Sequence, residues 1–197
     1  MSTILYFVRH GQVENPNNIV YARLPRFRLS EIGRQQAAQA ANILRSVQPA
    51  AIFSSPMLRA RQTAEIILLH HPGMHIQISR LINENYTPFQ GVSFDVIKAR
   101  NGDIFTGVNP PYEHPRDFLR RSLKFIRKIQ NQYPNQEVIA VTHGDIVRVI
   151  ILWALGLSLE QDNKDVKFPG TGSVIGLRFN SSNQERPNLE YLSSLYD

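Results

Sequence analysis

The chain has 197 residues, of which 42% are hydrophobic and 19% charged, with a formal net charge of +6. This length suits one domain with a full core, so we expect a single domain over residues 1–197. The absence of cysteine excludes disulfides, thiolate metal sites and thiol nucleophiles. No apolar run approaches the roughly 18 residues of a membrane span, and the N-terminus lacks the basic flank and cleavage site of a signal peptide, so we expect a cytoplasmic protein without membrane contact.

The first half of the chain alternates between short apolar runs and helical patterns. Ser30 precedes one helical pattern as an N-cap, and Pro72-Gly73 ends the next. In chain order we expect a strand at 3–9, a polar loop at 12–29, a helix from Ser30 to about Val47 with Ile32 on its inner face, a strand at 50–54, a helix that begins near Pro56, and a strand at 76–78.

The second half begins with a long stretch, residues 81–114, that contains no long periodic segment and many prolines and glycines. A loop-rich excursion of this length inside a compact domain is usually functional, often as a lid or substrate wall. Regular patterns then return. We expect a helix from Pro115 to about Tyr133, a strand at 137–142, a helix from about Asp145 to Leu155 closed by Gly156, and strands at 173–179 and 189–192.

Alternation of strands with helices predicts the fold class. It indicates an α/β three-layer sandwich with a mainly parallel central sheet and helices on both faces. In such sheets ligands bind beyond the carboxyl ends of the strands. Arg9-His10-Gly11 and His143-Gly144 both lie at such ends, so we expect them to share one site.

The residues at these strand ends suit an anion. His10 beside the fixed charge of Arg9 is a candidate nucleophile toward a phosphoryl group, and Gly11 frees the chain to turn after it. A guanidinium fits phosphoryl oxygens bidentately, and Arg59 offers a second one just beyond a strand end. We expect His143, in its protonated form, to be a further donor to the phosphoryl group.

Two weaker patterns have ordinary explanations. Basic residues recur at helical spacing in the predicted helix 115–133, and they indicate a solvated helix face rather than a nucleic-acid surface. They are Arg116, Arg120, Arg121, Lys124, Arg127 and Lys128. His70, His71 and His75 follow no metal-ligand spacing, so we expect no metal site.

Four motifs in order resemble the histidine phosphatase superfamily, in its phosphoglycerate-mutase-like branch. They are Arg9-His10-Gly11, the segment Leu29–Arg34, the segment Ser54–Ala64, and Val141-Thr142-His143-Gly144. The resemblance implies an α/β sandwich and a metal-independent enzyme without a cofactor. It implies that His10 becomes a phosphohistidine and that Arg9, Arg59 and His143 complete the phosphate pocket. The expected substrate-binding residues are Gly11, Asn17, Arg23 and Gly144.

The general acid has two candidates. Ile82-Asn83-Glu84 is similar to the segment that carries the acid in this family, so Glu84 is favoured. Asp145, two residues after His143, is the rival, because another branch places an aspartate directly after that histidine. A carboxyl buried beside the pocket can keep a raised pKa and hold a proton to donate.

Departures from the family pattern favour hydrolysis over phosphoryl shuttling. Mutase members carry asparagine where this chain has Pro16, Thr-Gly where it has Ala22-Arg23, and asparagine at the position of Asp145. A carboxylate at 145 would repel the second acidic group of a phosphoglycerate. We therefore expect a phosphomonoesterase that acts on a phosphorylated small molecule, not on nucleic acid. The alternatives are a phosphoglycerate-type mutase and a non-catalytic phosphate-binding module, and exposed apolar residues on the last strands allow a homodimer.

Overall fold

The central sheet determines where the strand ends meet. The computed structural model describes residues 2–159, 166–180 and 185–193, and these form one sheet of six strands. The strands are β1 (Thr3–Arg9), β2 (Pro49–Ser54), β3 (Ile76–Ile78), β4 (Glu137–Thr142), β5 (Val174–Phe179) and β6 (Asn188–Tyr191). Their order is β3-β2-β4-β1-β5-β6, with parallel pairing from β3 through β1 and β5 antiparallel to both its neighbours. The predicted mainly parallel sheet is confirmed.

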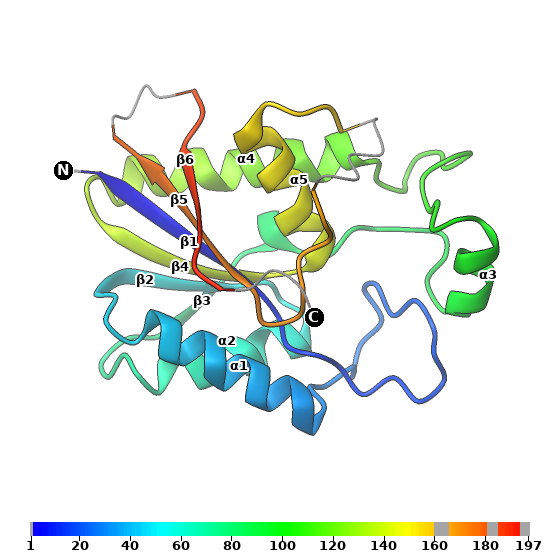
Figure 1. Cartoon of the computed structure of the whole chain (residues 1–197), viewed down its shortest axis with the longest axis horizontal. Coiled ribbons are helices and arrows are strands. Elements are labelled where there is room, and N and C mark those ends of the chain that lie inside the picture. Colours follow the sequence, from blue (N-terminus) through cyan, green and yellow to red (C-terminus); the bar gives the residue numbers. More distant parts are fainter. Residues whose placement is uncertain (1, 160–165, 181–184, 194–197) are drawn as a thin grey trace.

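Helices cover both faces of this sheet, as the α/β prediction requires. The helices of the described residues are α1 (Glu31–Leu44), α2 (Leu58–Leu68), α3 (Phe94–Ala99), α4 (Pro115–Gln132) and α5 (Gly144–Leu155), with a 3-10 turn η1 at Arg80–Ile82; α3 lies away from the sheet (Figure 1). Helices α1 and α2 pack on one face and α4 and α5 on the other (Figure 1). None of the helices in the described residues has both the length and the apolar character needed to cross a membrane.

Alternating side chains of the strands fill the two apolar layers. Along β1, Leu5 and Phe7 pack in the layer beneath α4 and α5, while Tyr6 and Val8 pack in the layer against α1 and α2. Because both faces are buried, the strand is a continuous apolar run rather than an alternating one. Whether residues 1–197 form a single domain stays a prediction.

The helix ends follow their capping residues. The Ser30 hydroxyl accepts a hydrogen bond from the Gly33 N–H at 3.0 Å, so the predicted N-cap of α1 is confirmed. Gly156 ends α5 in the left-handed conformation at φ 75°, also as predicted. The prediction that Ile32 lies on the inner face of α1 is wrong: it is 55% exposed, because the helix turns Gly33 and Ala37 toward the core instead.

The loop-rich excursion contains the helix that the sequence pattern missed. Helix α3 has six residues, fewer than two turns, and this is too short to show a helical period. Backbone hydrogen bonds tie its start to the loop at 12–29: Phe94 N–H donates to Asn18 O at 2.9 Å and Val20 N–H to Val92 O at 2.8 Å. Two segments distant in sequence therefore form one wall beside the strand ends, where α3 projects from the body of the molecule (Figure 1).

Candidate active site

Two histidines follow directly from adjacent parallel strands. In the register of β1 and β4, Arg9 pairs with Thr142, so His10 and His143 emerge side by side. The His10 N–H donates to Thr142 O at 3.0 Å, and the two imidazole rings lie 5.2 Å apart between centroids. Both side chains are buried. The structure thus brings together the two strand-end histidines that the sequence singled out.

Arg59 lies at the centre of the site. It is in the first turn of α2 and its side chain is 0% exposed, whereas Arg61 in the same turn is exposed. Arg59 Nε donates to His10 Nε2 at 3.0 Å, and Nη2 donates to Ala22 O at 2.8 Å and to Glu84 Oε2 at 3.2 Å. Nη2 also lies 3.2 Å from His143 Nδ1. One guanidinium therefore joins both histidines to a buried carboxylate.

Arg9 and Arg59 each have one guanidinium nitrogen whose N–H donors are unused. Arg9 Nε and Arg59 Nη1 are buried and find no hydrogen-bond partner among the described residues. A buried donor without a partner costs about 1–3 kcal/mol, more when it is charged. Two contacts hold the Arg9 guanidinium in place: Nη1 donates to Pro169 O, and the guanidinium carbon lies 5.1 Å from the Phe168 ring centroid. Such a pair of cationic donors suits an oxyanion.

The hydrogen bonds of His10 determine its tautomer. Nδ1 lies 2.8 Å from Gly11 O, a carbonyl that only accepts, so Nδ1 carries the proton. Nε2 is left with a lone pair, which accepts the hydrogen bond from Arg59. Burial, followed by the charges of Arg59, His143 and Arg9, holds the pKa of His10 well below its usual value. His10 is therefore neutral at physiological pH, with the nucleophilic nitrogen turned into the site.

Glu84 Oε2 lies 3.2 Å from His143 Nδ1, and each group shifts the pKa of the other. Burial alone raises the pKa of Glu84, but His143 and Arg59 beside it outweigh burial and hold the pKa below its usual range. Burial lowers the pKa of His143 to about 4, against the opposing effect of Glu84. Burial therefore favours the neutral form of His143, and the protonated form expected beside a phosphoryl group stays a prediction. Its Nε2 lies 2.7 Å from Ser55 Oγ, whose hydroxyl donates to Asn83 Oδ1 at 3.2 Å.

The carboxyl with a raised pKa is Asp145 rather than Glu84. It lies in the first turn of α5, and burial together with the charge of Glu84 raises its pKa to about 7. Asn85 Nδ2 donates to Asp145 Oδ2 at 2.6 Å. The two candidate acids thus differ: Glu84 is paired with Arg59, whereas the pKa of Asp145 is raised to about 7.

One group of side chains in the described residues consists of residue types that commonly bind a metal ion. Ligand atoms of His10, Glu84 and His143 lie within 4.8 Å of one another. The Arg59 guanidinium, however, is within 3.2 Å of all three. A permanent organic cation occupies the centre of these ligand atoms, so the group does not fit a metal ion.

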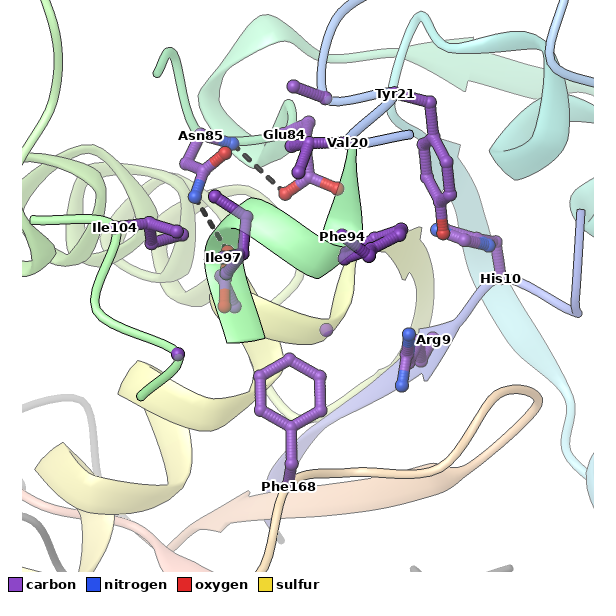
Figure 2. Close-up of a pocket in the computed structure, with 14 residues that line it drawn as sticks. Arg9, His10, Val20, Tyr21, Glu84, Asn85, Phe94, Ile97, Ile104 and Phe168 are labelled. Carbon is purple, nitrogen blue, oxygen red and sulfur yellow. Dashed lines mark hydrogen bonds between the residues drawn. The ribbon is translucent and has the colours of Figure 1, made fainter. Parts of the chain in front are cut away.

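A cavity of about 280 Å³ opens onto these residues. Figure 2 shows Arg9 and His10 on one side of it and Ile97 and Ile104 on the other, with Phe168 at its edge. Glu84, Asp145 and Tyr21 also line it, and the Tyr21 ring centroid lies 4.7 Å from the Arg59 guanidinium carbon. Charged and apolar side chains both line the cavity, and Phe168 lies next to Arg9.

The four expected substrate-binding residues have different positions. Gly144 lines the cavity, and a Cβ there would lie 2.5 Å from the Phe168 ring. Gly11 is needed for close packing rather than for a turn with positive φ: a Cβ would lie 2.1 Å from Gly33 O. Asn17 is exposed and the structure does not bring it to the cavity. Arg23 does not line the cavity either, because its Nη2 donates to Glu113 Oε2 at 2.8 Å.

Sequence reasoning missed the supports of Glu84. Arg23 Nε and Arg121 Nη2 donate to the Glu84 carbonyl oxygen at 2.8 and 3.0 Å, and Glu113 bridges both guanidiniums. The prediction that Arg121 belongs to the solvated face of its helix is therefore wrong, although the other five basic residues of that run are exposed. No local pattern marks Glu113, because its partners Arg23 and Arg121 lie 90 and eight residues away in the sequence.

These features define an α/β enzyme site for an oxyanion, built on a neutral histidine and two arginines. The model of the histidine phosphatase superfamily (branch 1) matches residues 5–188. The chain belongs to this superfamily and is a phosphatase of the histidine phosphatase type. The sequence-based identification of the family is confirmed.

The chain is similar to several known proteins, one of which is named as a phosphatase. Uncharacterized protein Rv0525 of Mycobacterium tuberculosis is 45% identical over 182 residues, which cover 88% of this chain and 90% of that protein. Glucosyl-3-phosphoglycerate phosphatase of Mycolicibacterium vanbaalenii is 28% identical over 172 residues, covering 79% and 76%. In fold the chain resembles the solved structure of Bacillus stearothermophilus YhfR, with a TM-score of 0.81 at 21% identity over 96% of both chains.

Proposed function

We propose that the chain is a metal-independent phosphomonoesterase that hydrolyses a phosphorylated small molecule through phospho-His10. The observation that carries this proposal is the orientation of His10. Its protonated Nδ1 is held by Gly11 O, and its basic Nε2 accepts from Nε of Arg59, the guanidinium whose Nη1 has unused donors. A neutral, oriented imidazole beside fixed cations is what nucleophilic attack on a phosphate ester requires.

In the first step the Nε2 lone pair of His10 forms a bond to phosphorus while the ester P–O bond breaks. The unused donors of Arg9 and Arg59 bind the phosphoryl oxygens. The leaving oxygen takes a proton from the general acid and departs as the alcohol. In the second step water attacks phosphorus, the N–P bond returns its electrons to His10, and the water proton goes to the carboxylate. Inorganic phosphate is released, and the starting enzyme is restored.

We propose Glu84 as the acid. A phosphate dianion that binds Arg59 takes that guanidinium from Glu84 and adds negative charge beside it, and both effects raise the pKa of the carboxyl. Asp145 stays the rival, because its pKa is already near 7. Glu84→Gln is expected to lose activity toward phenyl phosphate more than toward 4-nitrophenyl phosphate, whose more acidic phenol needs less protonation. Asp145→Asn is expected to keep both activities; the reverse pattern would assign the acid to Asp145.

The decisive experiment is trapping of the intermediate. Brief incubation with ³²P-labelled substrate is expected to leave an acid-labile label on the wild type and none on His10→Ala. EDTA is expected to leave turnover unchanged, since the Arg59 guanidinium occupies the position that a metal would take. Turnover that EDTA abolishes and added metal restores would overturn the mechanism.

The two alternatives give different products. A mutase would convert 3-phosphoglycerate into an isomer, whereas a phosphatase releases free phosphate. A non-catalytic module would bind phosphate without label or turnover. We favour hydrolysis because Asp145 lines the cavity and, once ionised, repels a second acidic group.

Other properties follow from the sequence alone. We propose that the enzyme acts in the cytoplasm and does not bind nucleic acid. We also propose that its outer strand β6, where Tyr191 is 49% exposed, allows a homodimer. Size-exclusion chromatography with light scattering tests the last of these.

A further inference from the structure

We propose that the preferred substrates are phosphate esters of bulky apolar alcohols that carry no second acidic group. This inference rests on the proposed function, since it assigns the outer part of the cavity to the leaving group. Five apolar side chains line that part: Val20, Phe94, Ile97, Ile104 and Phe168. They come from the 12–29 loop, from α3 and the loop after it, and from the segment before β5.

The apolar lining is partly open to solvent. Phe94 and Phe168 are 40% and 43% exposed, although each lines the cavity. Apolar rings that face a cavity at a catalytic centre gain by covering their surface with an apolar ligand, and aromatic rings add favourable stacking geometry. Figure 2 shows Phe94 beside His10 and Phe168 beside Arg9, so the alcohol part of a phosphate ester bound at His10 would contact them.

The charges of the cavity oppose a second anion. Arg9 is the one arginine or lysine among its described lining residues, and it belongs to the phosphate end. The other ionisable groups toward the leaving group are the carboxyls of Glu84 and Asp145. A carboxylate on the substrate's alcohol would therefore meet like charge without a new cation.

A neighbouring cavity of about 490 Å³ extends the available space. Gly102, Ile104, Asp145 and Phe168 line both cavities, so a bulky group can reach the boundary between them. The neighbouring cavity includes Arg148, but this guanidinium donates to Val166 O at 3.2 Å and does not line the first cavity.

The test compares two esters of primary alcohols with similar leaving groups, 3-phenylpropyl phosphate and 4-(phosphonooxy)butanoate. The wild type is expected to show at least a tenfold higher kcat/KM for the phenylpropyl ester. Phe94→Lys, a change at a partly exposed position, is expected to lower this ratio at least fivefold by adding a cation to the apolar part. Val96→Lys on the same helix is the control, since Val96 is 48% exposed and does not line the cavity; it is expected to keep the ratio.

The possible outcomes distinguish the inferred preference for apolar esters from the proposed hydrolysis through phospho-His10. Equal or faster hydrolysis of the carboxylated ester, with an intact label on His10, would overturn the inference and leave the phosphatase mechanism standing. An equal change of the ratio in Val96→Lys would also overturn it, because the effect would then be one of general charge. Absence of both label and turnover with either ester would overturn the proposed function, and the inference with it.

Discussion

Arg59 Nε donates a 3.0 Å hydrogen bond to His10 Nε2, the atom that we propose as nucleophile. The same guanidinium pairs with Glu84 at 3.2 Å, so the cation that would bind the substrate also holds the nucleophile and the acid. An arriving phosphoryl group competes for contacts that already exist. Arg59 thus holds the site together through these contacts, and its replacement tests that structural contribution.

Replacement of Arg59 is expected to destabilise the protein. Arg59→Ala leaves Glu84 as an uncompensated buried charge, which costs about 3–5 kcal/mol of unfolding free energy. Arg59→Ala combined with Glu84→Gln is expected to recover at least about 1 kcal/mol, because the second change removes that charge. Urea unfolding of the four proteins in this cycle measures the coupling. Strict additivity would show that the pair is not coupled in stability.

The pH dependence of catalysis is expected to report Asp145. As pH rises through its pKa of about 7, Asp145 gains a negative charge in the cavity and repels the substrate dianion, so kcat/KM falls between pH 6.5 and 8. His10 adds no acid limb in this range, because its pKa is well below the usual value. Asp145→Asn is expected to flatten the profile. A variant that keeps the fall would assign it to another group.

The same group is expected to affect stability with pH. The folded-state pKa of Asp145 is raised above that of the unfolded chain, so its contribution is present at low pH and lost as pH rises from about 4 through about 7. Unfolding free energies of the wild type and Asp145→Asn, measured by urea at several pH values, should differ least at low pH, where Asp145 is neutral like asparagine. The variant should become more stable relative to the wild type as pH rises through about 7. An unchanged difference across the range would contradict this.

Sequence patterns predicted the parts of the site that are local. His10 and His143 end apolar runs of strand length, and parallel pairing brings such ends together. Arg59 was recognised through the motif around it, since nothing in its own helical pattern marks full burial. The wall formed by α3 was not predicted, because six residues show no period and its position depends on backbone contacts with the 12–29 loop.

The supports of Glu84 were beyond local patterns for another reason. Glu113 joins Arg23, which is 90 residues away in the chain, to Arg121 eight residues away. Only the folded chain makes those three charges adjacent, and each alone is typical of a surface residue. Arg23 and Arg121 both donate to the backbone carbonyl of Glu84, the proposed acid.

Loss of the Glu113 carboxylate is expected to impair catalysis, although Glu113 does not line the cavity. Glu113→Gln weakens the hold on Arg23 and Arg121 and lets the Glu84 backbone shift, so kcat is expected to fall about 10- to 100-fold with little change in KM. The loss should be greater for phenyl phosphate than for 4-nitrophenyl phosphate, because the acid is displaced. Glu14→Gln, which breaks the exposed pair with Arg28, is the matched control and should change neither kcat nor stability appreciably. Equal losses on both substrates would contradict a positioning role.

Gly11→Ala is expected to damage both stability and activity, because two backbones meet at this glycine. The added Cβ would lie 2.1 Å from the carbonyl oxygen of Gly33, a backbone atom that cannot rotate away, so the loop after β1 must move from α1. Overpacking of this kind costs about 1–3 kcal/mol. The shift also moves Gly11 O, which fixes the tautomer of His10, so the rate of phosphohistidine formation should fall as well.

Gly176→Ala is the control: its Cβ first meets the end of the flexible Leu192 side chain at 3.2 Å, and it should retain full labelling of His10. Thermal unfolding and single-turnover labelling measure the two effects, and a Gly11→Ala protein with wild-type labelling would show that this backbone contact does not orient the nucleophile.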